Sequence, residues 1–314
     1  MLKDWAKNKR LESYVVTAIP VGHLLYVGFN VVTPDETFVG SVVVSIERST
    51  LATTVVYESN EPMVDYVVDG EGWHCLLMES CVVEIGPGAK PTVMKNLPTG
   101  LYRMAGIGKR RVAICGDDGQ VLTYEATKLK RLSVTTGPKS DGVEDLRAIA
   151  FDGSEIYVVG GYGTLSAGAT KLVPRWGKEN PFTVPNGRSI VFSVYASKTE
   201  IVAGGDHGIV AASPKGSTSW KHLTGLPNDV KVFAIVEFKG KMFVSTEENG
   251  FYLRSGTKLK RQKGEAGGYR MEANADVLAS SCGSFVYLFD GKAWTRLRLN
   301  PNPKKLVEKI KLDF

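Results

Sequence analysis

The chain has 314 residues, of which 43% are hydrophobic and 23% are charged, and its net charge at pH 7 is +6. This composition excludes a disordered chain, and the charge is too small to indicate nucleic-acid binding. Because the length exceeds the usual size of one domain, we expect two domains or one large β architecture.

Residues 1–12 form an N-terminal extension that lacks the apolar core of a secretory signal peptide. No stretch of the chain approaches the roughly 20 apolar residues of a membrane span. We therefore expect a cytoplasmic protein that does not enter a membrane.

After this extension one pattern recurs seven times. Each copy has a first β-type segment, a hydrophobic second strand that ends in small residues, a tight turn, a third strand and a shorter fourth strand. First strands are expected at 14–20, 63–69, 101–107, 146–152, 190–196, 230–238 and 269–275. The second and third strands are expected within 22–48, 72–88, 111–126, 155–169, 200–213, 241–256 and 276–291. Fourth strands are expected at 50–59, 91–97, 129–134, 171–184, 218–223, 258–263 and 293–299.

The pattern predicts an all-β fold, a seven-bladed β-propeller of four-stranded antiparallel blades over residues 13–299. Face-to-face stacking buries both sides of each sheet, as the β-branched and aromatic inner strands require. Small residues such as Gly204 and Gly205 end the second strands, where blades converge. No helical period separates the strands, which argues against a parallel α/β fold.

Two regions depart from the repeat. In the fourth blade, Pro174 and Pro181 predict a broken outer strand. The tail, residues 300–314, is expected to form a short amphipathic helix with Leu306, Ile310 and Phe314 on one face.

The fourth strands are basic, as in Lys128, Lys130 and Arg131 and again in Lys258, Lys260 and Arg261. Like charges on an exposed edge discourage pairing with a strand of another molecule. The alternative is that these strands form a basic face that binds a partner.

The four cysteines, Cys75, Cys81, Cys115 and Cys282, lie on different predicted strands and form no CxxC pair. We interpret them as free thiols in the sheets. No Cys/His cluster has zinc spacing, so no metal and no cofactor are expected.

The turns between second and third strands share one face of a propeller with the starts of the first strands. Primed hairpin turns explain their glycines, because glycine accepts positive φ. They do not explain why so many neighbouring residues are acidic, and such a rim suits a basic partner surface. The candidate partner-binding residues are Glu79, Asp117, Asp118, Tyr162, Asp206, His207, Glu247 and Glu248.

Arg103, Arg147 and Arg270 lie near the starts of three first strands. We expect them around the mouth of the central channel, where they would bind an anion or a carboxylate. The alternative is that they pair with the acidic turns and hold adjacent blades together.

Residues 213–220, SPKGSTSW, resemble a worn Asp-box of pattern S-x-D-x-G-x-T-W. Ser213 and Trp220 match, whereas Lys215 and Ser217 replace the Asp and the Gly, and residues 289–294 form a shortened relative. The chain thus resembles bacterial-neuraminidase-repeat and photosystem-assembly-factor-like propellers, which implies a propeller fold. Sialidases of that superfamily use an arginine triad, a Tyr–Glu pair and an acidic residue, and this complete set is not found here.

We therefore expect a monomeric, non-enzymatic protein that binds a protein partner with a basic surface. By analogy with stand-alone propellers encoded beside secreted toxins, its most specific role is that of an immunity-type inhibitor that neutralises a bacterial toxin. The alternative is a glycan- or small-molecule-directed enzyme that grips an acidic substrate with the three arginines. A third hypothesis, nucleic-acid binding by the basic outer strands, lacks the interleaved aromatic residues that stack on bases.

Overall fold

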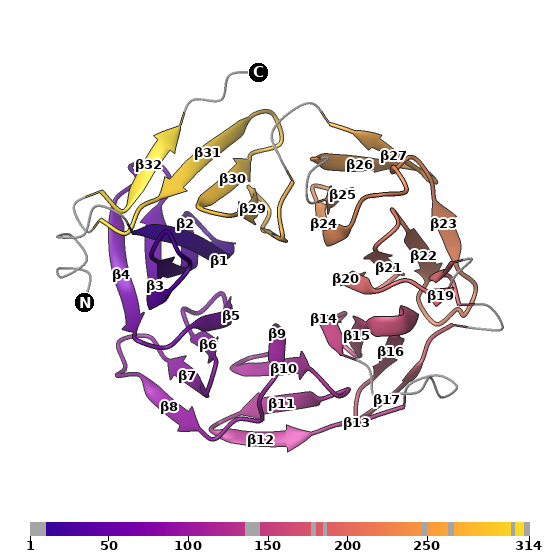
Figure 1. Ribbon diagram of the computed structural model, residues 1–314, viewed down its shortest axis with the longest axis horizontal. Coiled ribbons are helices and arrows are strands. Elements are labelled where there is room, and N and C mark those ends of the chain that lie inside the picture. Colours follow the sequence, from indigo (N-terminus) through magenta and orange to yellow (C-terminus); the bar gives the residue numbers. More distant parts are fainter. Residues whose placement is uncertain are drawn as a thin grey trace. The chain divides into compact units, whose positions relative to one another are not determined.

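The computed structural model describes residues 11–135, 145–176, 180–184, 187–246, 250–262, 267–302 and 305–310. Within them, seven successive sheets (blades 1 to 7) follow one another along the chain (Figure 1). Each sheet contains four strands that are neighbours in sequential order. This arrangement confirms the all-β, seven-bladed β-propeller with mostly four-stranded antiparallel blades.

Blades 1 to 3 contain β1 (Glu12–Val21), β2 (Leu24–Val32), β3 (Phe38–Glu47) and β4 (Thr53–Ser59); β5 (Met63–Val68), β6 (His74–Met78), β7 (Cys81–Ile85) and β8 (Thr92–Lys95); and β9 (Leu101–Gly108), β10 (Arg111–Gly116), β11 (Val121–Glu125) and β12 (Lys128–Arg131). Blade 4 contains β14 (Leu146–Phe151), β15 (Ile156–Gly160), β16 (Leu165–Gly168) and β17 (Lys171–Pro174), with β13 (Ser133–Val134) as a fifth strand and a 3₁₀ turn, η1 (Gly161–Gly163). Blades 5 and 6 contain β20 (Val191–Ala196), β21 (Glu200–Gly205), β22 (Val210–Pro214) and β23 (Lys221–Leu223); and β24 (Val232–Phe238), β25 (Lys241–Thr246), β26 (Phe251–Ser255) and β27 (Lys258–Arg261). Blade 7 contains β28 (Arg270–Ala273), β29 (Leu278–Cys282), β30 (Phe285–Phe289), β31 (Trp294–Leu299) and β32 (Val307–Ile310), and a separate hairpin joins β18 (Thr183–Val184) and β19 (Gly187–Arg188).

The chain packs into two compact units, which we describe separately. Unit 1 comprises Met1–Asn96, Glu237–Gly240 and Lys263–Phe314, and so holds blades 1, 2 and 7. Unit 2 comprises Leu97–Val236 and Lys241–Gln262, and so holds blades 3 to 6.

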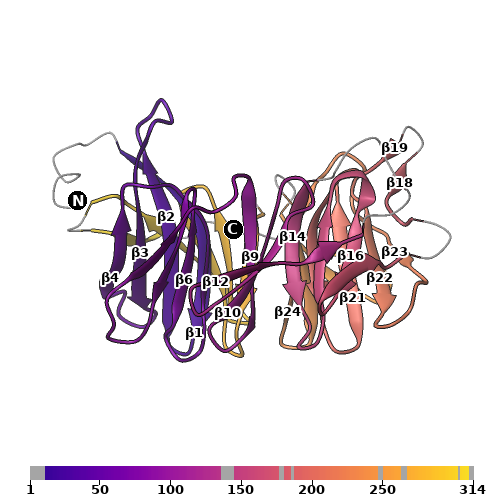
Figure 2. The same cartoon turned by 90° about the horizontal axis from the view of Figure 1, so that it is seen from below.

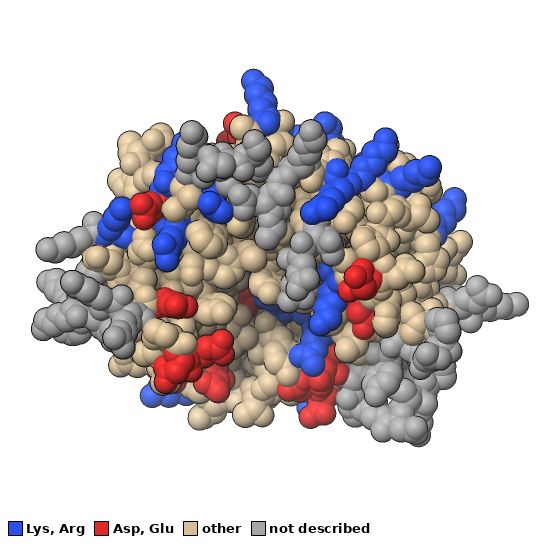
Figure 3. Space-filling view, turned by 45° about the horizontal axis from the view of Figure 1, so that its top comes forward, with Lys and Arg blue, Asp and Glu red and all other residues tan. Residues whose placement is uncertain are grey.

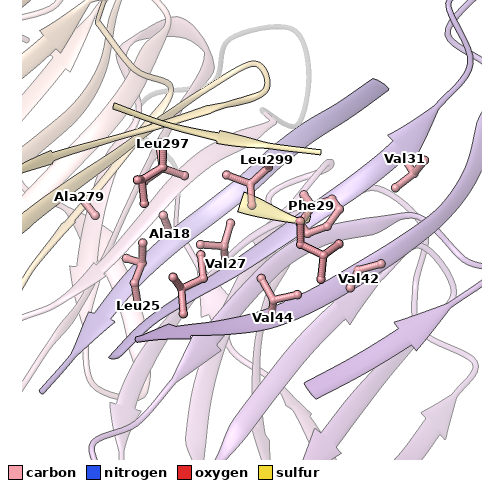
Figure 4. Packing of buried hydrophobic residues seen from close by; sticks show 13 residues of the cluster. Ala18, Leu25, Val27, Phe29, Val31, Val42, Val44, Ala279, Leu297 and Leu299 are labelled. Carbon is pink, nitrogen blue, oxygen red and sulfur yellow. The ribbon is translucent and has the colours of Figure 1, made fainter. Parts of the chain in front are cut away.

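In unit 1, the first and last blades of the chain pack against each other. Leu25, Val27 and Phe29 of blade 1 form one buried cluster with Leu297 and Leu299 of blade 7 (Figure 4). Backbone contacts reinforce this packing, since the N–H of Val15 donates to the carbonyl of Gly283 at 2.8 Å. The loop between β2 and β3 stands out at the top of this unit in Figure 2.

The prediction of a C-terminal helix is wrong. Residues 307–310 instead form β32, which pairs antiparallel with β31 from Leu299 opposite Val307 to Arg296 opposite Ile310. A helix of this length would be marginal in water, whereas β31 offers an unpaired edge for the backbone. Leu306 is buried against blade 7, and Phe314 lies outside the described residues.

Blade 4 is irregular, as Pro174 and Pro181 predicted. β17 ends at Pro174, and the chain then leaves the sheet before the hairpin of β18 and β19. Residues 133–134 were expected in the fourth strand of blade 3, but they form β13, which crosses from blade 3 and pairs in parallel with β17 of blade 4. Because both strands belong to unit 2, this crossing joins two of its blades.

The basic residues of β12 and β27 lie on outer strands. β12 pairs only with β11, and Lys128, Lys130 and Arg131 are exposed there. Figure 3 shows Lys and Arg together with Asp and Glu on the face that it draws, so the net positive charge does not form one continuous field there. This placement agrees with the protection of a sheet edge by charge.

The four cysteines are free, as expected. Cys75, Cys81 and Cys115 are buried, and Cys282 is partly exposed. Burial and a hydrogen bond to the Glu61 carboxylate raise the pKa of Cys81 to about 12, so this thiol stays protonated at neutral pH.

In unit 2, glycine ends the second strand of three blades because the first strand of the same blade starts against it. A Cβ at any of these glycines would overlap a backbone carbonyl oxygen; they are Gly116, Gly160 and Gly205. In blade 3 the oxygen belongs to Gly100, which also accepts the N–H of Asp117 at 2.7 Å. This close approach fixes each following turn beside the start of its own blade.

Gly116→Ala tests this constraint. We expect the free energy of unfolding to fall by about 1–3 kcal/mol, because the backbone of blade 3 must move to admit the methyl group. Gly70→Ala is the matched control, since a Cβ at Gly70 meets no heavy atom within 4 Å. Urea unfolding followed by circular dichroism measures both variants. Equal stability of the two would contradict the proposed close packing.

Candidate functional site

β-Bulges in the first strands of unit 2 set the directions of its candidate site residues. The register of β14 against β15 shifts between Leu146 and Ala148, so the bulged residue is Arg147. Corresponding shifts place Tyr102 of β9 and Phe192 of β20 in bulges. Bulges re-aim side chains and are common beside functional sites.

Tyr102 and Arg147 meet two carboxylates at the edge shared by blades 3 and 4. The Tyr102 hydroxyl donates to Asp117 Oδ1, and Arg147 Nη2 lies 2.9 Å from Asp145 Oδ2. The Arg147 guanidinium also lies 4.7 Å from the centroid of the Tyr102 ring. We call Tyr102, Asp117, Asp145 and Arg147 the carboxylate cluster.

The two carboxyl groups of this cluster influence each other. Burial and the neighbouring Asp117 carboxylate raise the pKa of Asp145, whereas Arg147 lowers it. The hydrogen bond to Asp117, together with burial, raises the pKa of Tyr102. Because two adjacent carboxylates repel each other, a cation added here would relieve the repulsion.

Two of the acidic turns, in blades 3 and 5, have the predicted primed geometry. In blade 3, Asp118 and Gly119 have φ values of 53° and 62°, and the N–H of Gln120 donates to the Asp117 carbonyl at 3.0 Å. In blade 5, His207 and Gly208 have φ values of 54° and 63°. Backbone geometry therefore explains the glycines of these turns, as expected.

The predicted partner-binding residues are divided between the units. Asp117, Asp118, Asp206 and His207 lie in turns of unit 2, whereas Glu79 lies in a turn of unit 1. Tyr162 lies in η1, but its side chain is outside the described residues, as are Glu247 and Glu248. Among the described residues, the side chains of Asp117 and Arg147 are brought into one cluster through Tyr102 and Asp145, and the backbone of Asp118 also hydrogen-bonds the Asp145 carboxylate.

Arg270 lies in unit 1 and is bound by two carboxylates. It pairs with Asp65 of β5, whose side chain is fully buried, and its Nε lies 3.2 Å from Glu272 Oε1. Burial lowers the pKa of Arg270, but the carboxylates of Asp65 and Glu272 outweigh burial and raise it. This neutralisation favours the alternative in which the arginine holds blades together.

Arg103 lies on β9 of unit 2, opposite Cys115 of β10. It is half-buried, next to the bulged Tyr102. Because Arg270 belongs to unit 1 and Arg103 and Arg147 belong to unit 2, the arrangement of all three around one channel mouth stays a prediction.

Sequence reasoning missed Tyr102, Asp145 and Asp65. Tyr102 adjoins Arg103, and only the bulge shows that Tyr102 takes the place that Arg147 holds in blade 4. Asp145 lies two residues before Arg147, and that proximity was a usable signal. Asp65 carries no local signal, because its partner Arg270 is 205 residues away.

Residues 213–220, which resemble an Asp-box, form a turn supported by the two residues that match the pattern. The buried Ser213 hydroxyl donates to the Ser219 carbonyl at 2.9 Å, and Trp220 Nε1 donates to the Arg175 carbonyl at 3.0 Å. In the shortened relative, Asp290 Oδ1 accepts the N–H of Ala293 at 2.8 Å. Both turns thus keep side-chain support without the full motif.

Within the part of the chain that the structure describes, no group of three or more His, Cys, Asp and Glu residues is placed to hold a metal ion. None of the helices among the described residues is long and apolar enough to cross a membrane.

Comparisons with known proteins show similarity of fold and not of sequence family. No protein-family model and no curated protein sequence match the chain. The extracellular domain of BT4673 from B. thetaiotaomicron is 12% identical with a TM-score of 0.62, and the match covers 96% of this chain and 46% of that one. The chain therefore spans about half the length of that structure.

Two further structures match over nearly their full length. YCF48, solved bound to a D1 peptide, is 12% identical with a TM-score of 0.63, and the match covers 91% of this chain and 97% of that one. A chain of the Mitotic Checkpoint Complex is 9% identical with a TM-score of 0.63, and the match covers 87% of this chain and 91% of that one. At these identities the likeness shows a seven-bladed β-propeller and nothing about activity.

The buried pair of Asp65 and Arg270 allows a test by double-mutant cycle. We expect Arg270→Ala to lower the free energy of unfolding by about 3–5 kcal/mol, because it leaves the buried Asp65 carboxylate without its cation. Asp65→Ala should lower it less, because Glu272 still pairs with Arg270. The double variant should lose less than the sum of the two. Glu125→Ala breaks the exposed pair with Arg111 and should cost at most about 1 kcal/mol. Additive losses at Asp65 and Arg270 would contradict a direct pair.

The electrostatics of the carboxylate cluster predict opposite shifts in two variants. Asp117→Asn should lower the pKa of Asp145, because it removes the neighbouring carboxylate. Arg147→Ala should raise that pKa further, because it removes the stabilising cation. Carboxyl NMR titration of Asp145 measures both shifts, and shifts of the same sign would show that the two groups do not act on Asp145 as described.

Proposed function

We propose that the protein is a non-enzymatic β-propeller that binds a protein partner, and that the acidic turns of unit 2 receive a basic surface of that partner. The observation that carries this proposal is the carboxylate cluster, in which Asp117 and Asp145 lie against each other. Like charges held together raise the free energy of the unbound protein, and a Lys or Arg side chain from a partner would lower it.

Two of the similar structures are consistent with binding in general. YCF48 was solved with a D1 peptide, and another matching chain is part of a Mitotic Checkpoint Complex. The toxin-neutralising role, the cytoplasmic location, the monomeric state and the kinship with Asp-box propellers stay predictions within this proposal.

An enzyme that uses the carboxylate cluster is the second candidate. The raised pKa of Asp145 favours it, since a general acid must hold its proton near the working pH. Tyr102 argues the other way, because its hydrogen bond to Asp117 raises its pKa, whereas a tyrosinate nucleophile needs a lowered one. The raised pKa of Tyr102 therefore favours binding.

The proposal is tested by affinity capture from native lysate with the wild type and three variants. We expect a stoichiometric protein partner, retained by the wild type and by Glu125→Gln, and reduced about tenfold or more in Asp117→Asn/Asp145→Asn and in Asp206→Asn. Glu125→Gln is a matched control because this carboxylate is exposed in the same unit, away from the cluster.

Retention of the partner should also fall steeply as salt rises, since opposite charges in water are screened. Equal capture by all variants would contradict the proposed site, and capture of no stoichiometric partner would contradict the proposed function.

A further inference from the structure

The first strands of unit 2 carry a row of half-buried side chains that runs over four blades. It starts with Tyr102 and Arg147, which stack 4.7 Å apart, and continues with Phe192 and Phe233, whose ring centroids lie 5.3 Å apart. β14, which carries Arg147, packs against both β9, which carries Tyr102, and β20, which carries Phe192. We call these four residues the bulge row.

The bulge row is chemically divided. Its end on blades 3 and 4 carries the carboxylates of Asp117 and Asp145, whereas its end on blades 5 and 6 is aromatic. Half-buried phenylalanine rings in contact offer an apolar surface on which another side chain can pack. The row therefore has one end for a cation and one for an apolar group.

A separate observation in blade 5 indicates a missing hydrogen-bond donor. Asp206 Oδ1 is buried and has no hydrogen-bond partner, and the same holds for the hydroxyl of the fully buried Ser189. Both residues lie beside Ile190, whose carbonyl accepts the N–H of Asp206 at 3.0 Å, two residues before Phe192. An unsatisfied carboxylate oxygen is costly, and an N–H from a bound molecule would satisfy it.

We propose that the bulge row binds an extended peptide that places an apolar side chain on Phe192 and Phe233 and a Lys or Arg side chain at Asp117 and Asp145. This inference rests on the proposed function and names the chemistry of the partner segment. The charge complementarity selects a basic residue.

The geometry of stacked sheets limits the spacing of the two anchors. The middle of the aromatic end, on blades 5 and 6, lies two blades from the middle of the acidic end, on blades 3 and 4. Stacked sheets are about 10 Å apart, so the two middles are separated by at most about 20 Å. An extended chain rises about 3.3 Å per residue, so the apolar and basic residues should be no more than about six positions apart.

The test uses fluorescein-labelled Gly/Ser peptides that contain one Phe and one Lys separated by two to six positions, measured by fluorescence anisotropy with the full chain. We expect the best of these peptides to bind about tenfold or more tightly than matched peptides with Phe and Glu, or with Ala and Lys. The reversed order of Phe and Lys tests the direction of the peptide.

Variants assign each anchor to its end of the row. Phe192→Ala/Phe233→Ala should abolish the advantage of Phe over Ala, and Asp117→Asn/Asp145→Asn should abolish the advantage of Lys over Glu. Phe192→Leu keeps most of the apolar volume and so controls for loss of the fold in the Ala variants. It should lose only part of the tighter binding of Phe peptides over Ala peptides. Val173→Ala is the matched control, since Val173 is an exposed apolar residue on the outer strand β17 of the same unit.

Binding that depends on Lys but not on Phe or the two phenylalanines would overturn the inference and leave the proposed function standing. Loss of the protein partner in the carboxylate variants but full retention in Phe192→Ala/Phe233→Ala would do the same. Peptide binding as expected, without any captured protein, would support the bulge row and contradict the proposed function.

Discussion

The close approach of backbone to backbone at the end of the second strand, in three of its four blades, is the constraint on which the rest of unit 2 depends. Gly116, Gly160 and Gly205 each leave room for a carbonyl at the start of the first strand of the same blade. The residue after each glycine donates its N–H to that carbonyl, so turn and first strand are fixed together. The same contact brings Asp117 to Tyr102 in blade 3. A steric requirement of the fold thus determines where the carboxylate cluster can form.

Charge is used in two different ways in unit 2. Opposite charges join neighbouring blades, as where Arg254 of blade 6 holds both oxygens of Glu200 of blade 5 at 2.6 and 2.9 Å. Lys215 reaches the buried carboxylate of Asp152 at 2.5 Å in the same manner. The packing of the blades accounts for such pairs, because each charged group neutralises a partner that folding has removed from water. Asp117 and Asp145 are like charges held side by side, and blade packing alone gives no reason for that arrangement.

The periodic pattern of strands and turns was enough to predict seven blades, their strand order and the primed turns, because these depend on local alternation and on glycine. It failed at the tail, where residues 307–310 pair with β31 instead of forming a helix, since the free edge that decides the matter is a tertiary feature. The candidate site was predicted from the sequence only in part. Asp117 and Arg147 were predicted as candidate residues. In blade 3, however, the bulged position that corresponds to Arg147 is held by Tyr102 and not by Arg103, and this one-residue bulge leaves no mark in the sequence. Asp65 and Arg270 meet across 205 positions, and no local pattern can pair them.

One physical explanation accounts for weak sequence motifs in a chain whose fold matches known propellers. At 12% identity the fold of YCF48 is kept, so the fold tolerates replacement of most side chains. What must be kept is backbone geometry, such as glycine where strands touch and side-chain support for the turns. Ser213 supports its turn although Lys215 and Ser217 stand where the Asp-box pattern has Asp and Gly. The bulged positions carry no such requirement, since Val64 occupies one in blade 2 and Tyr102, Arg147 and Phe192 occupy others. Because the fold does not dictate the residues at those positions, a row of aromatic and charged side chains there indicates function more strongly than the turns do.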